Sequence, residues 1–208
     1  MKDTERRFLE ERVAARMSPY RFAHTKGVAG MAERLAALFC PDARETLVAA
    51  ALLHDVTKEL SDCEQLSLIR EAGIALREDE LASPKIYHGI TAPLVIRRDF
   101  PEYATDSILL PVRWHTTGHR GMSLAEALLY LADYIEEGRQ FSDCVALRTL
   151  FFEKDLSACS PEERLAHLRL VVCRSLEMTV EELERKGTPL CLDTVEALRF
   201  FTEEEYPL

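Results

Sequence analysis

The chain lacks the segments that would carry a protein into or across a membrane. Residues 1–17 are rich in charge and contain no apolar run of the kind that forms the centre of a secretory signal. No stretch approaches the roughly 20 apolar residues that are needed to span a bilayer. We therefore expect a cytoplasmic protein that does not contact a membrane.

Paired cysteine motifs are also missing. The 6 cysteines form no Cys-x-x-Cys pair, and their spacing is irregular. A chain of 208 residues can bury a full core and needs neither disulfides nor a structural zinc merely to fold. Three disulfides are the alternative, but without a secretory signal we expect reduced thiols.

Positive charge is scarce relative to negative charge. The sequence has 26 Lys and Arg against 36 Asp and Glu, which gives a net charge of -10. Such a surface repels the phosphates of duplex DNA and of an anionic membrane, so we expect neither as a partner. A small anionic substrate remains compatible, because a bound divalent cation reverses the local field.

No convincing alternating strand, repeat or long linker is present. Apolar residues instead recur at helical spacing after His24, and the segment Thr46–Leu53 is apolar on most sides. We expect an all-α helical bundle in a single domain, residues 1–208, with a core over about 18–152 and a C-terminal helical extension over 153–208.

Cap and turn residues indicate where the helices begin and end. Ser61, Ser123 and Ser160 are each followed by Glu three residues later, which predicts three capping boxes. Further predicted boundaries are a helix end at Pro41, a cap at Asp42, a turn at 84–89 that holds His88, a break at Pro101, a helix from Asp106 to His115, a helix end at Gly138, and a turn at 186–189.

The central chemical signal is the His54-Asp55 doublet at the end of the apolar helix. At a helix end both side chains can reach one ion, although a capped helix end with a hydrogen-bonded histidine is the ordinary alternative. His24 lies on an apolar helix face, where a core histidine is the more frequent finding. Asp133 also lies in an apolar helix, where a buried carboxylate needs a metal or a cation such as Arg113 or Arg139.

His88 and His115 complete a candidate set of nitrogen and oxygen ligands that suits iron, manganese or zinc. In a two-metal arrangement Asp55 would bridge, with one ion near His24, His54 and Asp133 and the other near His88 and His115. Lys58 lies one helical turn beyond Asp55, and Arg139 follows Asp133 closely. Both side chains would neutralise phosphates, or else they are ordinary surface charges.

These positions resemble the HD superfamily of metal-dependent phosphohydrolases and, more closely, its YqeK family of bacterial symmetrical diadenosine tetraphosphate hydrolases. The resemblance covers roughly residues 18–152. The segments that carry it are Ala23-His24-Thr25, 51–60, Tyr87-His88-Gly89, Arg113-Trp114-His115-Thr116-Thr117-Gly118, Gly121-Met122-Ser123-Leu124, Tyr130-Leu131-Ala132-Asp133-Tyr134-Ile135-Glu136 and Glu137-Gly138-Arg139.

The resemblance implies a helical HD fold that forms homodimers, binds one or two iron ions and splits diadenosine tetraphosphate into two ADP. By the same resemblance, the metal ligands are His24, His54, Asp55, His88, His115 and Asp133. The expected substrate contacts are His24, Asp55, Lys58, Arg139, Gly187, Thr188, Pro189, Leu190, Cys191 and Leu192, for a dinucleoside polyphosphate or an ADP- or GDP-like nucleotide.

The expected mechanism is attack of metal-activated water on a β-phosphate, with Asp55, Lys58 and His119 in catalytic roles and His119 protonating the leaving group. A plain surface histidine is the alternative for His119. For the whole chain, the alternatives are another HD-type nucleotide phosphatase or phosphodiesterase, a nucleotide-binding regulatory module, and a helical scaffold with chance histidines.

Overall fold

The computed structural model describes residues 3–203, and every regular element in that range is helical. The α-helices of the first part are α1 Asp3–Ala14, α2 Pro19–Phe39, α3 Arg44–Leu53, α4 Asp62–Glu71, α5 Glu78–Leu81 and α6 Tyr87–Asp99. Those of the second part are α7 Asp106–Trp114, α8 Leu124–Ile135, α9 Ser142–Phe152, α10 Pro161–Lys186 and α11 Leu192–Thr202. Short 3-10 helices are η1 Pro41–Ala43, η2 Pro84–Ile86, η3 Pro101–Tyr103 and η4 Leu156–Ala158. The all-α prediction is confirmed.

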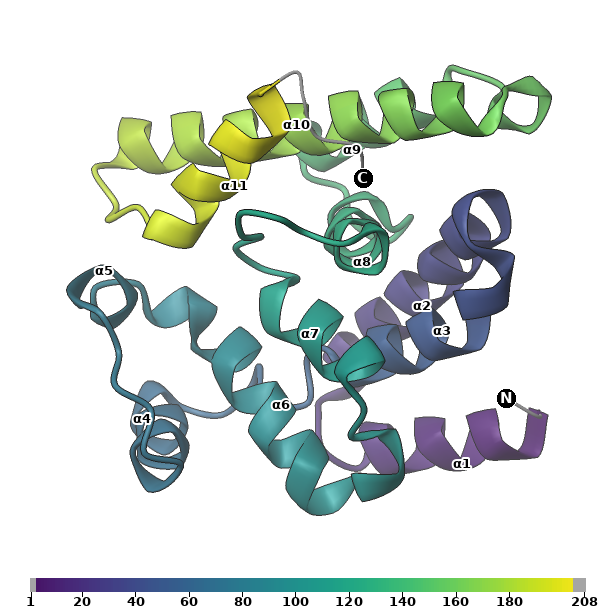
Figure 1. Ribbon diagram of the computed structural model, residues 1–208. Coiled ribbons are helices and arrows are strands. Elements are labelled where there is room, and N and C mark those ends of the chain that lie inside the picture. The colour runs from purple at the N-terminus through teal and green to yellow at the C-terminus, as the bar shows by residue number, and fades with distance from the viewer. Residues whose placement is uncertain (1–2, 204–208) are drawn as a thin grey trace.

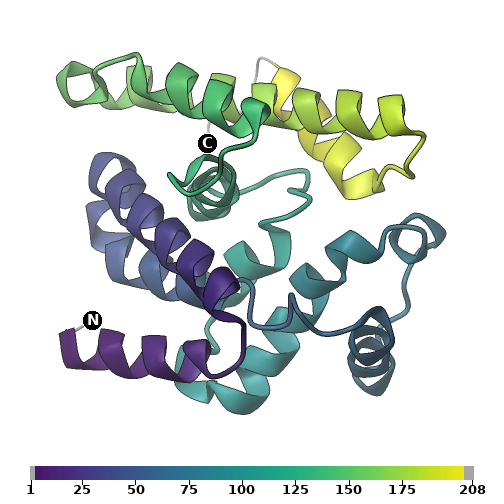
Figure 2. The same ribbon diagram turned by 180° about the vertical axis from the view of Figure 1, so that it is seen from behind.

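Helices α2, α3, α7 and α8 form the centre of the molecule. Helix α2 packs against α3 and α8, while α7 packs against α3, α6 and α8 (Figure 1). The long helix α10 runs along one side of this centre with α11 folded back beside it, and α1 lies on the opposite side. Figure 2 shows the same order from behind. The helices that carry the predicted ligands thus meet in the middle of the fold.

One buried apolar cluster extends through the described residues from α1 to α11. It includes Leu9 of α1, Leu52 of α3, Leu131 of α8 and Phe201 of α11. Residues beyond 153 therefore share the core of the preceding helices. The division into one domain with a C-terminal extension stays a prediction.

The three predicted capping boxes are confirmed. The side chains of Ser61, Ser123 and Ser160 each accept a hydrogen bond from the backbone N–H of the glutamate three residues later. The carboxylate of that glutamate in turn accepts a hydrogen bond from the backbone N–H of the serine. The predicted turn after α10 is also confirmed, since Gly187 takes the left-handed conformation with φ 61°. These signals are local, which is why the sequence alone reveals them.

Two predicted boundaries are wrong. Asp42 does not cap α3, because it lies inside η1 and the N-cap residue of α3 is Ala43. Gly138 does not end α8, because Glu136 already leaves the helical conformation, with ψ 150°. Gly138 lies in the turn that follows.

The prediction that His88 lies in a turn is also wrong. The short helix η2 leads directly into α6, so His88 is in the first turn of a helix and is only 3% exposed. Gly89 has no turn role. It allows α6 to approach α7, since a Cβ at this position would lie 3.0 Å from the carbonyl oxygen of Arg113.

Among residues 3–203, no helix is both long enough and apolar enough to cross a membrane.

Candidate metal centre

All six predicted metal ligands come together in the structure, although they come from five different helical segments. His24 lies in α2, His54 and Asp55 follow α3 directly, and His88 lies at the start of α6. His115 follows α7, and Asp133 lies in α8. The helix packing at the centre of the fold therefore creates the cluster.

Asp55 lies between two pairs of histidines. Its Oδ2 atom is 3.3 Å from His54 Nε2 and 3.8 Å from His24 Nε2. Its Oδ1 atom is 3.5 Å from His88 Nε2 and 3.9 Å from His115 Nε2. One carboxylate thus faces a different pair of imidazoles with each oxygen, which is the arrangement expected of a ligand that bridges two ions.

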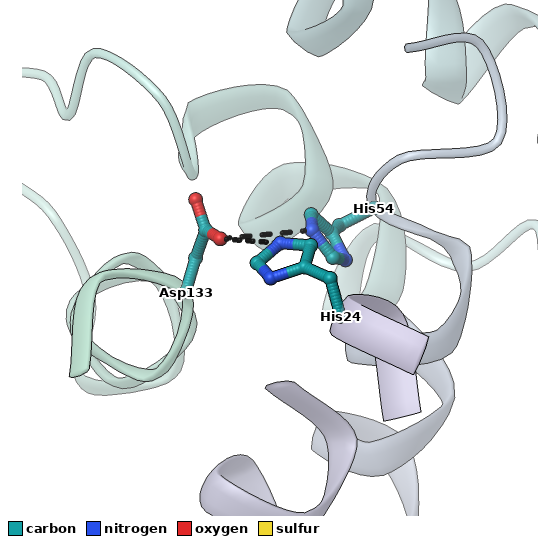
Figure 3. A group of neighbouring side chains, drawn as sticks. All are labelled: His24, His54 and Asp133. Carbon is teal, nitrogen blue, oxygen red and sulfur yellow. Dashed lines mark ion pairs between the residues drawn. The ribbon is translucent and has the colours of Figure 1, made fainter. Parts of the chain in front are cut away.

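Asp133 completes the group on the His24 side. Its Oδ1 atom lies 3.0 Å from His24 Nε2 and 3.9 Å from His54 Nε2 (Figure 3). The ligand atoms of these three residues lie within 4.8 Å of one another, and so do those of His54, Asp55 and His115. The structure therefore offers two overlapping groups of ligand atoms that share His54.

Hydrogen bonds at the outer ring nitrogens orient the histidines. Nδ1 of His54 donates to the carbonyl oxygen of Ala51 at 2.6 Å, and Nδ1 of His115 donates to that of Val112 at 2.7 Å. Because a carbonyl oxygen can only accept, each Nδ1 carries the proton and each Nε2 presents its lone pair to the cluster. Metal-binding histidines are held in this way.

Two of the four inner histidine nitrogens lack hydrogen-bond partners. Nε2 of His24 and Nε2 of His54 are buried without a hydrogen-bond partner in the part of the chain that the structure describes. Unsatisfied buried polar atoms are costly, and a metal ion that accepts both lone pairs removes the cost. With two carboxylates beside four imidazoles, the donor set fits a divalent transition metal.

The charge states of most ligands also fit a metal. Burial lowers the pKa of His115 to about 4 and the pKa of His88 well below its usual value, so both rings are neutral near pH 7. Burial acts to raise the pKa of Asp55, yet neighbours including His54 hold it well below its usual range. Neutral imidazoles and ionised carboxylates are the forms that bind metal.

His24 is the exception. Burial acts to lower its pKa, but the carboxylates of Asp133 and Glu136 outweigh burial and raise the pKa of His24 to about 9. The two carboxylates attract positive charge to this ring, whether the charge is a proton or a metal ion. A metal and a proton therefore compete for Nε2 of His24.

Three cationic side chains line a cleft of about 690 Å³ beside His24, namely Arg21, Lys58 and Arg139. Arg139 donates to Asp133 at 2.6 Å, Arg21 donates to Asp55 at 3.0 Å, and Lys58 lies 3.1 Å from His88 Nε2. The Nε atoms of both arginines are buried and have no hydrogen-bond partner among the described residues. Of the two arginines considered as partners of Asp133, Arg139 takes this place, whereas Arg113 pairs with Glu80.

Glu136 and Arg21 belong to the site, and sequence reasoning gave neither of them a role. The carboxylate of Glu136 accepts from His24 Nδ1 at 3.1 Å and from the N–H of Gly138 at 2.6 Å. It also lies against Gly27, where a Cβ would collide with it. The only sequence signal was the placement of Gly27 three residues after His24, so that both face the same side of α2.

The remaining predicted contacts lie at the edge of this cluster or beyond it. His119 pairs with Glu126 at 3.1 Å and stacks on Trp114. Glu126 precedes Asp133 in α8 by about two helical turns. The loop Gly187–Leu192 packs against the segment before α6, where the N–H of Leu192 donates to Asp79 at 2.8 Å. Roles in catalysis and in nucleoside binding stay predictions for His119 and for this loop.

Comparison with known proteins agrees with this site. The HD domain family model matches residues 21–138. The symmetrical bis(5'-nucleosyl)-tetraphosphatase of Bacillus subtilis is 31% identical over 183 residues, which cover 88% of this chain and 89% of that protein. The enzyme of the same name from Halalkalibacterium halodurans is 29% identical over the same coverage.

A solved structure is similar along nearly the whole chain. The crystal structure of a predicted HD superfamily hydrolase involved in NAD metabolism from Clostridium acetobutylicum has a TM-score of 0.80 and 25% sequence identity. The similarity covers 97% of this chain and 98% of that one. The resemblance found in the sequence is thereby confirmed: the chain belongs to the HD domain family, and within it to the same family as the symmetrical bis(5'-nucleosyl)-tetraphosphatases.

Proposed function

We propose that the chain is a metal-dependent hydrolase that cleaves diadenosine tetraphosphate symmetrically into two ADP. The observation that carries the proposal is a cluster of six nitrogen and oxygen ligands beside a cleft that is lined by Arg21, Lys58 and Arg139. The activity of the similar tetraphosphatases supplies the substrate class.

Bound metal would supply Lewis acidity for a phosphate and for the attacking water. His24, His54, Asp55, His88, His115 and Asp133 are the residues that would hold it. The bond that forms joins the water oxygen to a β-phosphorus, and the bond that breaks joins that phosphorus to the central bridging oxygen. One ADP takes the hydroxyl group, and the other leaves and takes up a proton.

The protein's own part in the reaction is electrostatic. A tetraphosphate carries several negative charges, and the acidic chain as a whole repels it. Arg21, Lys58 and Arg139 provide a local positive field at the metal centre. The guanidinium groups of the two arginines carry N–H donors of the kind that bind phosphate oxygens. Fixed donors of this kind stabilise the charge of the transition state.

Several finer points belong to the same proposal. The ligand set suits iron, and manganese or another divalent metal would suit it as well. All six cysteines are free, which fits the reduced environment of the cytoplasm. A homodimer is proposed from the resemblance, and light scattering of the purified protein tests it.

The test is product analysis with a metal-site variant. Purified protein loaded with ferrous iron is incubated with diadenosine tetraphosphate, and nucleotides are separated by chromatography. We expect ADP as the sole product, with activity and bound iron both lost in His54→Ala. His167→Ala is the matched control, because His167 lies outside the cluster and donates to the carbonyl oxygen of Phe151.

Other outcomes contradict the proposal in different ways. AMP together with ATP means asymmetric cleavage. Faster turnover of nucleoside monophosphates or cyclic nucleotides identifies another HD-type phosphatase or phosphodiesterase. Tight ADP binding with no product from a fully metal-loaded sample indicates a regulatory binding module, and absence of bound metal indicates a scaffold.

A further inference from the structure

The cleft at the metal centre has an aromatic rim. Besides His24 and the three cations, Tyr20 and Phe141 line it. A volume of about 690 Å³ lies within the usual range of small-molecule sites. The cleft is therefore larger than phosphate binding alone requires.

Both aromatic side chains are unusually exposed. Tyr20 is 80% exposed and Phe141 is 67% exposed, the two highest values among the large exposed apolar residues of the described chain. Aromatic rings bury a large area when they pack, so leaving two of them in water at one cleft forgoes considerable stabilisation. Exposed aromatic rings that gather at a cleft are typical of a binding site.

Each ring also lies close in sequence to a polar residue of the site. Tyr20 precedes His24 by four residues in α2, so the two side chains occupy the same face of the helix one turn apart. Phe141 is the N-cap residue of α9 and follows Arg139 by two residues. Each ring of the aromatic rim therefore shares a segment of the chain with a polar residue that lines the cleft.

The order of chemistry along the cleft matches a nucleotide. The cations and the metal ligand His24 are partly buried in its lining, whereas the rings of Tyr20 and Phe141 are exposed. A nucleoside diphosphate has the same order, from charged phosphates to a flat base. Rings of this kind bind bases by stacking, with little preference for one base over another.

Resting on the proposed function, we propose that Tyr20 and Phe141 stack one nucleobase of the dinucleoside tetraphosphate while its phosphates reach Arg21, Lys58 and Arg139. The substrate has a second nucleoside, which lies beyond the bond that breaks. The loop Gly187–Leu192 packs near the His88 side of the cluster, through Asp79 and Ser83, and is the predicted contact for that second nucleoside.

The test compares a ligand that has a base with one that has none. Titration calorimetry on manganese-loaded protein gives dissociation constants for ADP and for inorganic pyrophosphate. In the double variant Tyr20→Ala/Phe141→Ala we expect ADP to bind on the order of tenfold to a hundredfold more weakly, with pyrophosphate unchanged. The conservative variants Tyr20→Phe and Phe141→Tyr keep ADP affinity. Phe8→Ala removes an exposed ring of α1 and is the matched control.

Two results overturn the proposal. Unchanged ADP affinity in the double variant means that the rings do not bind the base. An equal loss for ADP and pyrophosphate means that the substitutions disturb the phosphate end. Failure of the wild-type protein to cleave diadenosine tetraphosphate contradicts the proposed reaction instead, and the comparison of ADP with pyrophosphate still decides whether the rings stack a base.

Discussion

Substitution of Glu136 gives the sharpest test of how the metal centre is held. The Glu136 side chain is only 3% exposed and accepts a hydrogen bond from His24 Nδ1 at 3.1 Å. In Glu136→Ala the ring of His24 loses the partner that orients it and strengthens its ligand nitrogen. We expect metal to bind about 10-fold to 100-fold more weakly.

The energy of the lost hydrogen bond leads to the same magnitude. A hydrogen bond to a charged group contributes about 1.5–3 kcal/mol, and about 1.4 kcal/mol corresponds to a factor of ten in affinity. Loss of this one bond therefore corresponds to the same 10-fold to 100-fold range. Glu136→Gln keeps an acceptor oxygen but loses the charge, so a smaller effect is expected.

Gly27→Ala provides a second route to the same effect. A Cβ at residue 27 would occupy the space of the Glu136 carboxylate and push it away from His24. We expect this variant to weaken metal binding to a similar degree although no polar group is removed. Glu137→Gln is the control, because Glu137 is 75% exposed and pairs with Arg34 at the surface.

The assay is competition for metal against a coloured chelator of known affinity, with circular dichroism to confirm that each variant is folded. Equal metal affinity in Glu136→Ala and the wild-type protein refutes the reasoning. Weakening in Glu136→Ala without weakening in Gly27→Ala means that the contact with Gly27 does not position the carboxylate.

Three further predictions concern the phosphates, the metal and the fold. Arg139→Ala is expected to lower kcat/KM about 100-fold or more with diadenosine tetraphosphate, and Arg139→Lys to restore part of it; metal content measured in parallel shows whether the loss acts through Asp133 instead. At a free metal concentration of about 100 times the dissociation constant, removal of the metal should lower the free energy of unfolding by about 2.7 kcal/mol. Calorimetry should then show Tm falling by about 5–10 °C. An unchanged Tm contradicts a metal site at the centre of the fold. Ser160→Ala removes the capping box of α10 and should lower Tm by about 2–4 °C with unchanged metal content, whereas a loss of metal would show that α10 positions the site.

The sequence predicted features whose causes lie within a few residues. The capping boxes of Ser61, Ser123 and Ser160 depend on a glutamate three positions later, and helical periodicity identified the apolar faces. The six ligand positions were also predicted, but only from their combination and from the family resemblance, because each residue alone has an ordinary structural explanation. Sequence alone could not give the distances between them, which depend on how five segments pack.

Contacts between distant residues explain what was missed. Glu136 lies 112 residues from His24, and Arg21 lies 34 residues from Asp55, so no local pattern connects either pair. His88 was misplaced because the glycine after it resembles a turn residue. Gly89 instead serves the close approach of α6 to α7, which depends on the tertiary fold.

The spread of the ligands along the chain has a consequence for biosynthesis. His24, His54 and Asp55 leave the ribosome early, but Asp133 follows much later, near the end of α8. A partly synthesised chain therefore cannot offer the complete site to a metal ion. Because metal binding stabilises only the folded arrangement, we expect metal to be bound only by chains whose synthesis and folding are complete. A pulse of radioactive metal during translation in vitro should accordingly label full-length chains and leave chains truncated before residue 133 unlabelled.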